Sequence, residues 1–128
     1  PEGHPDARFK LITWDSDATW GNNWDGKELE PNLTEWHGTD HFAPRILSIA
    51  YYCKQYLARF TEWLGGPFKP ETLHGWVDRS ADEIREAANA DAIRWNRNFN
   101  FEREITRLKA AITARHKVMT DVVRRQRP

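Results

Sequence analysis

Apolar residues recur every three or four positions through the last two-thirds of this chain. This spacing places apolar side chains on one face of an α-helix and predicts four helical segments, at about 42–64, 70–90, 91–96 and 101–123. The proposed core stripes are Ile46, Leu47, Ile49, Ala50, Cys53, Leu57, Phe60 and Leu64; Leu73, Trp76, Val77, Ile84 and Ala88; and Ile105, Leu108, Ile112, Met119, Val122 and Val123. The sequence therefore predicts a mainly α fold.

Residues at the ends of these segments support the same assignment. Asp40 is placed to cap the first helix and Asn100 the last, because their short side chains accept hydrogen bonds from backbone N–H groups. The Gly65-Gly66 pair predicts the end of the first helix, and Pro70 suits the first position of the second. We expect the turn-rich residues 96–100 to separate the third and fourth helices.

Residues 9–14 form the only convincing strand pattern, alternating apolar and polar side chains. A single strand leaves its edges unpaired, so this one needs partners that the chain does not offer. The chain also begins with Pro1 and not with Met. We therefore expect a single domain or a domain fragment spanning 1–128, made of a strand and Asp-x-Asp loop (1–21), a Trp-rich loop (22–41) and a helical body (42–128).

Residues 21–40 are rich in Gly, Asn, Asp and Pro, and they predict a long loop. Loops longer than about 12–15 residues in compact domains are usually functional or disordered. Trp20, Trp24 and Trp36 favour an ordered loop that packs on the helices. The formal net charge is zero, but acids dominate the first part of the chain and bases the last, so the two parts are expected to attract each other.

Asp15 and Asp17 follow the predicted strand directly and are the candidate metal ligands. Carboxylate oxygens at a strand end suit Mg²⁺, which favours one or two carboxylates plus phosphate oxygens. Capping of backbone N–H groups at a strand exit is the competing interpretation. A calcium EF-hand loop is excluded, because the positions that require Gly and Glu are Trp20 and Gly26. A sugar-nucleotide transferase is also excluded, because the chain lacks an alternating α/β pattern.

Other polar groups have simpler explanations. His37 and His41 lie in a loop pattern that does not favour zinc, and Arg94-Trp95 reads as a packing tryptophan with ion-paired neighbours. Cys53 fits a buried small hydrophobic residue. The chain lacks an apolar run long enough to span a membrane and the aromatic, basic surface of a nucleic-acid binder. Neither a membrane span nor a nucleic-acid partner is expected.

Residues 14–21 read Trp-Asp-x-Asp-x-Thr-(aromatic)-Gly. This pattern resembles a signature of the spore-coat protein H kinase-like family (CotH-like). The resemblance continues through the helix at 45–64, the helix with Pro70, Leu73 and Val77-Asp78, the Asp91-x-x-Arg94-Trp95 stretch, and the last helix with Leu108-Lys109-x-x-Ile112-x-x-Arg115. It covers nearly the whole chain. The resemblance implies a protein-kinase-like α+β fold, of which this chain is the helical C-lobe-like part with one N-terminal strand.

The resemblance also implies a function: Mg²⁺- or Mn²⁺-dependent transfer of the γ-phosphate of ATP to serine residues of a protein substrate. Asp15, and then Asp17, would hold the metal and ATP phosphates. A spore coat, cell-surface or secreted location is implied in the same way. No Gly-rich phosphate loop, strand Lys or catalytic-loop Asp is found before residue 10, so this chain alone is expected to be inactive and to need a missing N-terminal lobe or second chain. The alternative is a non-catalytic helical module that binds a protein through its Trp-rich loop.

Overall fold

The computed structural model describes residues 42–126, with the side chains from residue 43. This part of the chain forms four α-helices: α1 (Phe42–Leu47), α2 (Ala50–Leu64), α3 (Pro70–Arg94) and α4 (Phe101–Gln126). No strand occurs among these residues, so the prediction of a mainly α protein is confirmed for residues 42–126. The predicted strand at 9–14, the loop at 22–41 and the proposed cap Asp40 lie outside the described residues.

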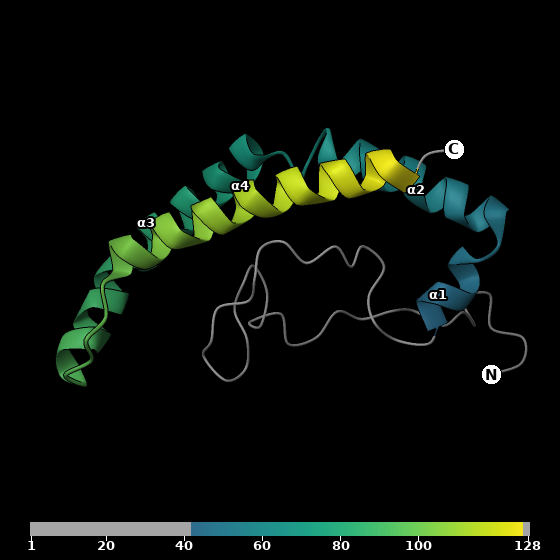
Figure 1. The fold of residues 1–128 in the computed structure, drawn as a ribbon. Helices are drawn as coiled ribbons and strands as arrows, with labels where there is room; N and C mark the ends of the chain where they lie inside the picture. The colour runs from purple at the N-terminus through teal and green to yellow at the C-terminus, as the bar shows by residue number, and fades with distance from the viewer. Residues whose placement is uncertain (1–41, 127–128) are drawn as a thin grey trace, which may run out of the picture.

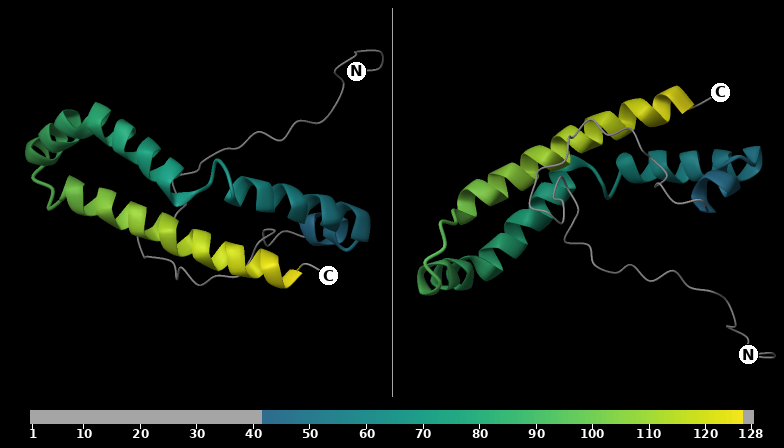
Figure 2. Two further views of the ribbon diagram at one scale, coloured as in Figure 1. Left: turned by 90° about the horizontal axis from the view of Figure 1, so that it is seen from above. Right: turned by 60° about the horizontal axis from the view of Figure 1, so that its bottom comes forward.

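Helix α4 is the element on which the others are arranged. It packs against both α3 and α2, and α1 contacts α2 at the far end. Helices α3 and α4 form an antiparallel hairpin, and α2 continues the line of α3 along the same side of α4 (Figures 1 and 2). The described helices are therefore two layers deep, with α4 in one layer and α2 and α3 in the other.

The predicted single helix over 42–64 is wrong at Ser48 and Ile49, where the chain separates α1 from α2. The Ser48 hydroxyl donates to the Arg45 carbonyl at 2.8 Å, and Ile49 has an extended backbone with φ −86° and ψ 112°. Serine side chains that bond to nearby backbone groups compete with helical hydrogen bonds. Apolar periodicity does not detect this competition, which explains the error.

The end of α2 and the start of α3 lie where the sequence predicts them. Helix α2 ends at Leu64, and the N–H of Gly65 donates to the Thr61 carbonyl at 3.0 Å. The N–H of Phe68 donates back to the Trp63 carbonyl at 2.9 Å, which closes the connection tightly. Lys69 is extended and Pro70 occupies the first position of α3, where its missing N–H costs no helical hydrogen bond.

The separate short helix predicted at 91–96 is a continuation of α3, which runs unbroken to Arg94. The helix ends in a Schellman motif. Asn96 adopts a positive φ of 46°, its N–H donates to the Ile93 carbonyl, and the N–H of Arg97 donates to the Ala92 carbonyl. Asparagine tolerates this left-handed conformation better than most residues. The turn is therefore set by Asn96, five residues after the predicted break.

Asn100 caps α4 as predicted, because its side-chain oxygen accepts a hydrogen bond of 2.9 Å from the N–H of Arg103. Glu102 and Glu104 lie in the first turn, and Arg124 and Arg125 lie in the last. These charges oppose the partial charges of the helix ends. Helix α4 extends three residues beyond the predicted end.

The core lies between α4 and the other layer. One cluster joins α2 to the C-terminal half of α4 through Leu57, Leu64, Met119, Val122 and Val123, with Cys53, Phe60 and Val118 packed against it. Leu73, Ala81, Phe101 and Ile112 are also buried. Five predicted core positions are wrong, because Ile46, Ile49, Ala50, Trp76 and Ile84 are exposed. In a two-layer arrangement a wide apolar face is covered on one side only.

No helix among the described residues is long and apolar enough to cross a membrane.

Candidate functional site

The residues that the sequence nominates for metal binding lie outside the described part of the chain. These are Asp15 and Asp17, and the same holds for His37 and His41. Their predicted roles are therefore untested by the geometry. The described helices do contain a groove. Its polar residues were not predicted from the apolar periodicity of the sequence.

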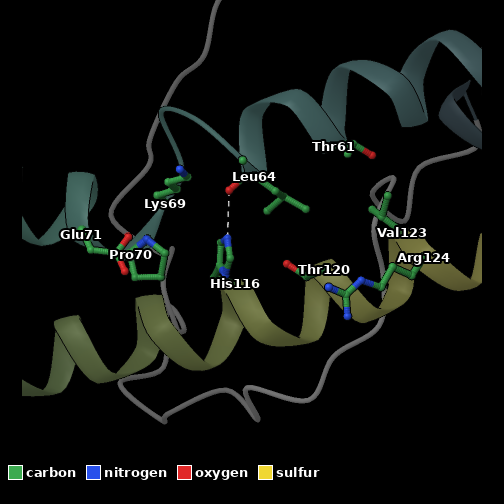
Figure 3. Close-up of a pocket in the computed structure, with 10 residues that line it drawn as sticks. Thr61, Leu64, Lys69, Pro70, Glu71, His116, Thr120, Val123 and Arg124 are labelled. Atoms are coloured by element: carbon green, nitrogen blue, oxygen red, sulfur yellow. Dashed lines mark hydrogen bonds between the residues drawn. The ribbon is translucent and has the colours of Figure 1, made fainter.

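The groove lies where α2 ends, α3 begins and the C-terminal half of α4 passes beneath both (Figure 3). Its volume is about 780 Å³. It is lined by Thr61, Leu64, Gly65, Lys69, Pro70, Glu71, His116, Thr120, Val123 and Arg124. Ligand pockets commonly measure about 300–1,000 Å³, so the space is large enough for an aromatic side chain or a short peptide segment.

His116 joins the two layers at the centre of the groove. Its ring projects from α4, and Nε2 lies 3.0 Å from the carbonyl oxygen of Leu64, the last residue of α2 (Figure 3). Carbonyl groups in the last turn of a helix lack intrahelical partners. We infer that Nε2 carries the proton and donates it to this carbonyl, which fixes the end of α2 against α4.

Thr120 lies one turn beyond His116 on α4. Its hydroxyl oxygen is buried, and no hydrogen-bond partner for it occurs among residues 42–126. A buried hydroxyl without a partner is unfavourable for folding. Lys69 and Arg124 lie toward opposite ends of the groove, with Glu71 beside Lys69 (Figure 3). Arg124 also lies 3.6 Å from the Asp121 carboxylate.

The Arg94-Trp95 pair lies at an exposed turn, so the prediction of a packing tryptophan is wrong, because Trp95 is 59% exposed. The Arg94 guanidinium lies 5.3 Å from the centre of the Trp95 ring, within the range of a cation–π contact. Arg97 lies 3.9 Å from the Asp91 carboxylate. All four residues are exposed at the turn between α3 and α4. Because ion pairs this exposed are weak, they do not define a ligand site.

Polar contacts also fix α3 against α4. His74 Nε2 lies 3.0 Å from the Lys109 carbonyl oxygen and 3.2 Å from the Thr113 hydroxyl. Asp78 on α3 forms an ion pair with the side chain of Lys109 on α4. Nearer the turn, Arg85 pairs with Glu102, and its guanidinium lies 5.5 Å from the centre of the Phe101 ring. These contacts hold the hairpin in register.

Two titratable side chains have pKa values that are shifted from their ordinary values. A hydrogen bond from Arg107, with a further one from Arg103, lowers the pKa of Glu104 despite partial burial. Burial raises the pKa of Tyr56. Neither residue lines the groove, so neither pKa shift supports a catalytic role for the groove.

The described residues contain no group of three or more His, Cys, Asp or Glu side chains placed to hold a metal ion. Cys53 is a half-buried free thiol beside the α2–α4 core, in keeping with its predicted role as a small hydrophobic residue.

Comparison with known proteins supplies the family. The chain matches the family model described as CotH kinase protein over residues 3–119. This chain belongs to the CotH family. It is 27% identical over 96 residues to the inner spore coat protein H of Bacillus subtilis (strain 168). That alignment covers 75% of this chain and 26% of the relative, so the chain spans about a quarter of the relative's length. No solved structure gave a significant match.

The family match covers both parts of this CotH-family chain. It includes residues 14–21 with the Asp-x-Asp pattern, and it continues through α1, α2, α3 and most of α4. The groove residues were missed from the sequence, although one signal was present. His116 lies on the apolar face of α4, four residues after Ile112 and three before Met119. A histidine at such a position needs a polar partner, and the end of α2 provides it.

Proposed function

We propose that this chain is part of a CotH-family kinase domain that transfers the γ-phosphate of ATP to serine residues of a protein. The observation that carries the proposal is the extent of the family match, which begins at residue 3 and so includes Asp15 and Asp17. The chemistry of these two side chains fits the role. Paired carboxylates provide the hard oxygen ligands that Mg²⁺ accepts beside phosphate oxygens.

In this proposal Asp15 is the first metal ligand, because it directly follows the predicted strand, and Asp17 is the second. Bound Mg²⁺ or Mn²⁺ would neutralise charge on the phosphate oxygens of ATP during transfer. The carboxylates themselves have a positioning role, since they would fix where the phosphates lie relative to the helical body. Helices α2, α3 and α4 supply the rigid support that such a site requires.

The remaining kinase elements are proposed to lie elsewhere in a longer protein or in a second chain. A phosphate-binding Gly-rich loop, a strand Lys with its helix Glu and a catalytic Asp with its Asn are parts of kinase catalysis. None is recognised before residue 10 of this sequence. The chain spans only about a quarter of the relative, which leaves ample length for them in a protein of that size.

Metal binding tests the proposed ligands directly. We expect the chain to bind Mn²⁺, used as a spectroscopic probe for Mg²⁺, and Asp15→Ala to weaken binding at least tenfold, because a two-carboxylate site loses a charged ligand. Asp25→Ala is the matched control, since it removes a nearby carboxylate outside the pattern. Electron paramagnetic resonance of free Mn²⁺ gives the affinity. Equal affinities for Asp15→Ala and Asp25→Ala would contradict the assignment.

A second candidate is a non-catalytic module that binds another protein. Exposed aromatic residues in the described part of the chain favour it: Tyr51, Tyr52, Tyr56, Trp63, Trp76, Trp95 and Phe99. Aromatic residues are frequent at binding hot spots. The Mn²⁺ titration separates the two candidates. A module predicts that Asp15→Ala and Asp17→Ala leave metal binding unchanged, while Trp24→Ala abolishes binding of the partner.

A further inference from the structure

Large apolar side chains remain exposed along one side of both α2 and α3. They are Tyr52, Tyr56 and Trp63 on α2 and Trp76 and Ile84 on α3, and each is 39–53% exposed. We call these five residues the aromatic edge. Its four aromatic side chains, which would bury roughly 150–250 Å² each in a core, leave about 300–450 Å² uncovered in total. An apolar patch of this size commonly marks an interaction site.

The two helices turn these side chains toward the same side of their layer. Successive residues of a helix are about 100° apart around its axis. The α2 members of the edge lie about 100–140° from the buried Leu57, and the α3 members lie about 60–140° in the same rotational sense from the buried Ala81. Because α2 and α3 run in the same direction along α4 (Figures 1 and 2), the aromatic edge follows one border of the α2–α3 layer.

The spacing along this edge fits a second copy of the chain turned end to end. A two-fold axis near the α2–α3 connection would place α2 of each copy beside α3 of the other. Tyr56 and Trp63 are seven residues apart, about 10.5 Å along the helix, and Trp76 and Ile84 are eight apart, about 12 Å. In that arrangement Trp63 can therefore face Trp76 while Tyr56 faces Ile84.

The charges of the two helices fit the same arrangement. Helix α2 contains two Lys or Arg against one Glu, whereas α3 contains six Asp or Glu against three Arg. Arg59 lies one turn before Trp63 on the outer border of the edge, and Glu83 directly precedes Ile84. Pairing Trp63 with Trp76 brings Arg59 of one copy within about one helical turn of Glu83 of the other.

We propose that a second copy of this chain covers the aromatic edge in a symmetric dimer. Trp63 of each copy packs on Trp76 of the other, and Tyr56 packs on Ile84. The aromatic side chains of the two copies together contribute about 600–900 Å². With the isoleucines and the charged border the interface reaches about 1,000 Å², the lower limit for a specific contact. The dimer is therefore weak, and it needs neither bound metal nor kinase activity.

Sedimentation equilibrium of the full 128-residue chain, with EDTA present, tests the dimer. We expect the average mass to rise from 15.1 kDa toward twice that value as the concentration increases from about 1 µM to about 1 mM. Trp76→Glu places a charge in the interface and should raise the dissociation constant at least roughly tenfold. Ile93→Glu is the matched control, because Ile93 is 81% exposed on α3 and lies outside the aromatic edge.

A charge exchange gives a second test that leaves the aromatic edge intact. Arg59→Glu or Glu83→Arg alone should weaken the dimer about threefold or more, and the two together should restore it, because each dimer contains the pair twice. Arg59 also pairs with Glu62 in its own helix at 3.0 Å, and recovery in the double variant separates the contact between copies from this local one. Lys54→Glu, at an exposed position on the other side of α2, is the control.

The contradicting results are specific. A species of 15.1 kDa at every concentration overturns the proposal and assigns the aromatic edge to a different occupant. Equal effects of Trp76→Glu and Ile93→Glu, or no recovery in the double variant, show that the copies associate through another surface and overturn it too. Circular dichroism shows whether each variant keeps its helices, and if Trp76→Glu loses them the charge exchange decides. Because divalent cations are excluded, these results leave the proposed metal site untouched, and a negative Mn²⁺ titration leaves the dimer intact.

Discussion

At the scale of single residues, two histidines among the described residues fix one helix against another. His116 holds the last carbonyl of α2, and His74 does the same for a carbonyl in the middle of α4. Both histidines lie on largely apolar helix faces, where an unpaired ring nitrogen would be unfavourable. Their partners are backbone carbonyls on neighbouring helices, so each contact sets the position of a whole element.

The contribution of Glu104 to the stability of the fold is expected to depend on pH. Its carboxylate accepts a hydrogen bond of 2.8 Å from Arg107, and this contact lowers its pKa below the ordinary value of 4.5. A lowered pKa means that the carboxylate form stabilises the folded state above pH 4.5 and that this contribution is lost as the pH falls through the folded value. We expect Glu104→Gln to reduce the free energy of unfolding by about 0.5–1 kcal/mol at neutral pH.

Urea unfolding at neutral and acidic pH measures this difference. The loss caused by Glu104→Gln should shrink as the carboxylate of the parent protein becomes protonated. Arg107→Gln, alone and combined with Glu104→Gln, completes a double-mutant cycle that isolates the pair. A loss of the same size at both pH values would show that Glu104 acts through packing and not through its charge.

At the scale of elements, the helix boundaries depend on a few local backbone contacts. The Ser48 hydroxyl bond accompanies the break between α1 and α2, and Asn96 ends α3 by adopting a left-handed conformation. Within residues 42–126, Asn96 is the one non-glycine residue with a positive φ. Its conformation therefore controls how the α3–α4 hairpin closes.

Substitution of Asn96 tests this control. We expect Asn96→Val to reduce the free energy of unfolding by about 1–2 kcal/mol, because a β-branched residue is strained at positive φ. Asn96→Gly should be neutral or slightly stabilising. Asn98→Val in the same turn serves as the control and should change stability little. Urea unfolding gives all three values, and equal losses for the two valine variants would contradict a specific role for Asn96.

These elements also show what the sequence could predict. The Gly65-Gly66 stop, Pro70 and the Asn100 cap were recognised because each residue type has a strong local preference. The exposure of Trp76 and Ile84 could not be recognised, because periodicity identifies an apolar face and not what covers it. The groove depends on three elements meeting, and its polar residues are ordinary when considered singly.

At the scale of the whole molecule, the two-layer arrangement leaves much apolar surface uncovered in the described helices. The apolar residues of α2 and α3 face α4 on one side, while Trp63, Trp76 and Ile84 remain exposed on their helices. An isolated pair of layers buries less apolar surface than a full domain core. This arrangement suits a part that supports further structure, in keeping with a chain that spans about a quarter of its relative.

The whole-molecule prediction concerns ATP turnover. We expect the purified 128-residue chain to hydrolyse no ATP above the buffer rate with Mg²⁺ present, because phosphoryl transfer requires a phosphate loop, a lysine and a catalytic carboxylate in addition to the metal ligands.

A full-length CotH-family protein containing this segment should phosphorylate a serine peptide. Asp15→Ala in that protein should lower kcat at least a hundredfold, a typical loss for one electrostatic contact. Asp25→Ala is the control. Release of radiolabelled phosphate measures both proteins, and Mg²⁺-dependent turnover by the short chain, lost in Asp15→Ala, would show that it is a complete catalyst.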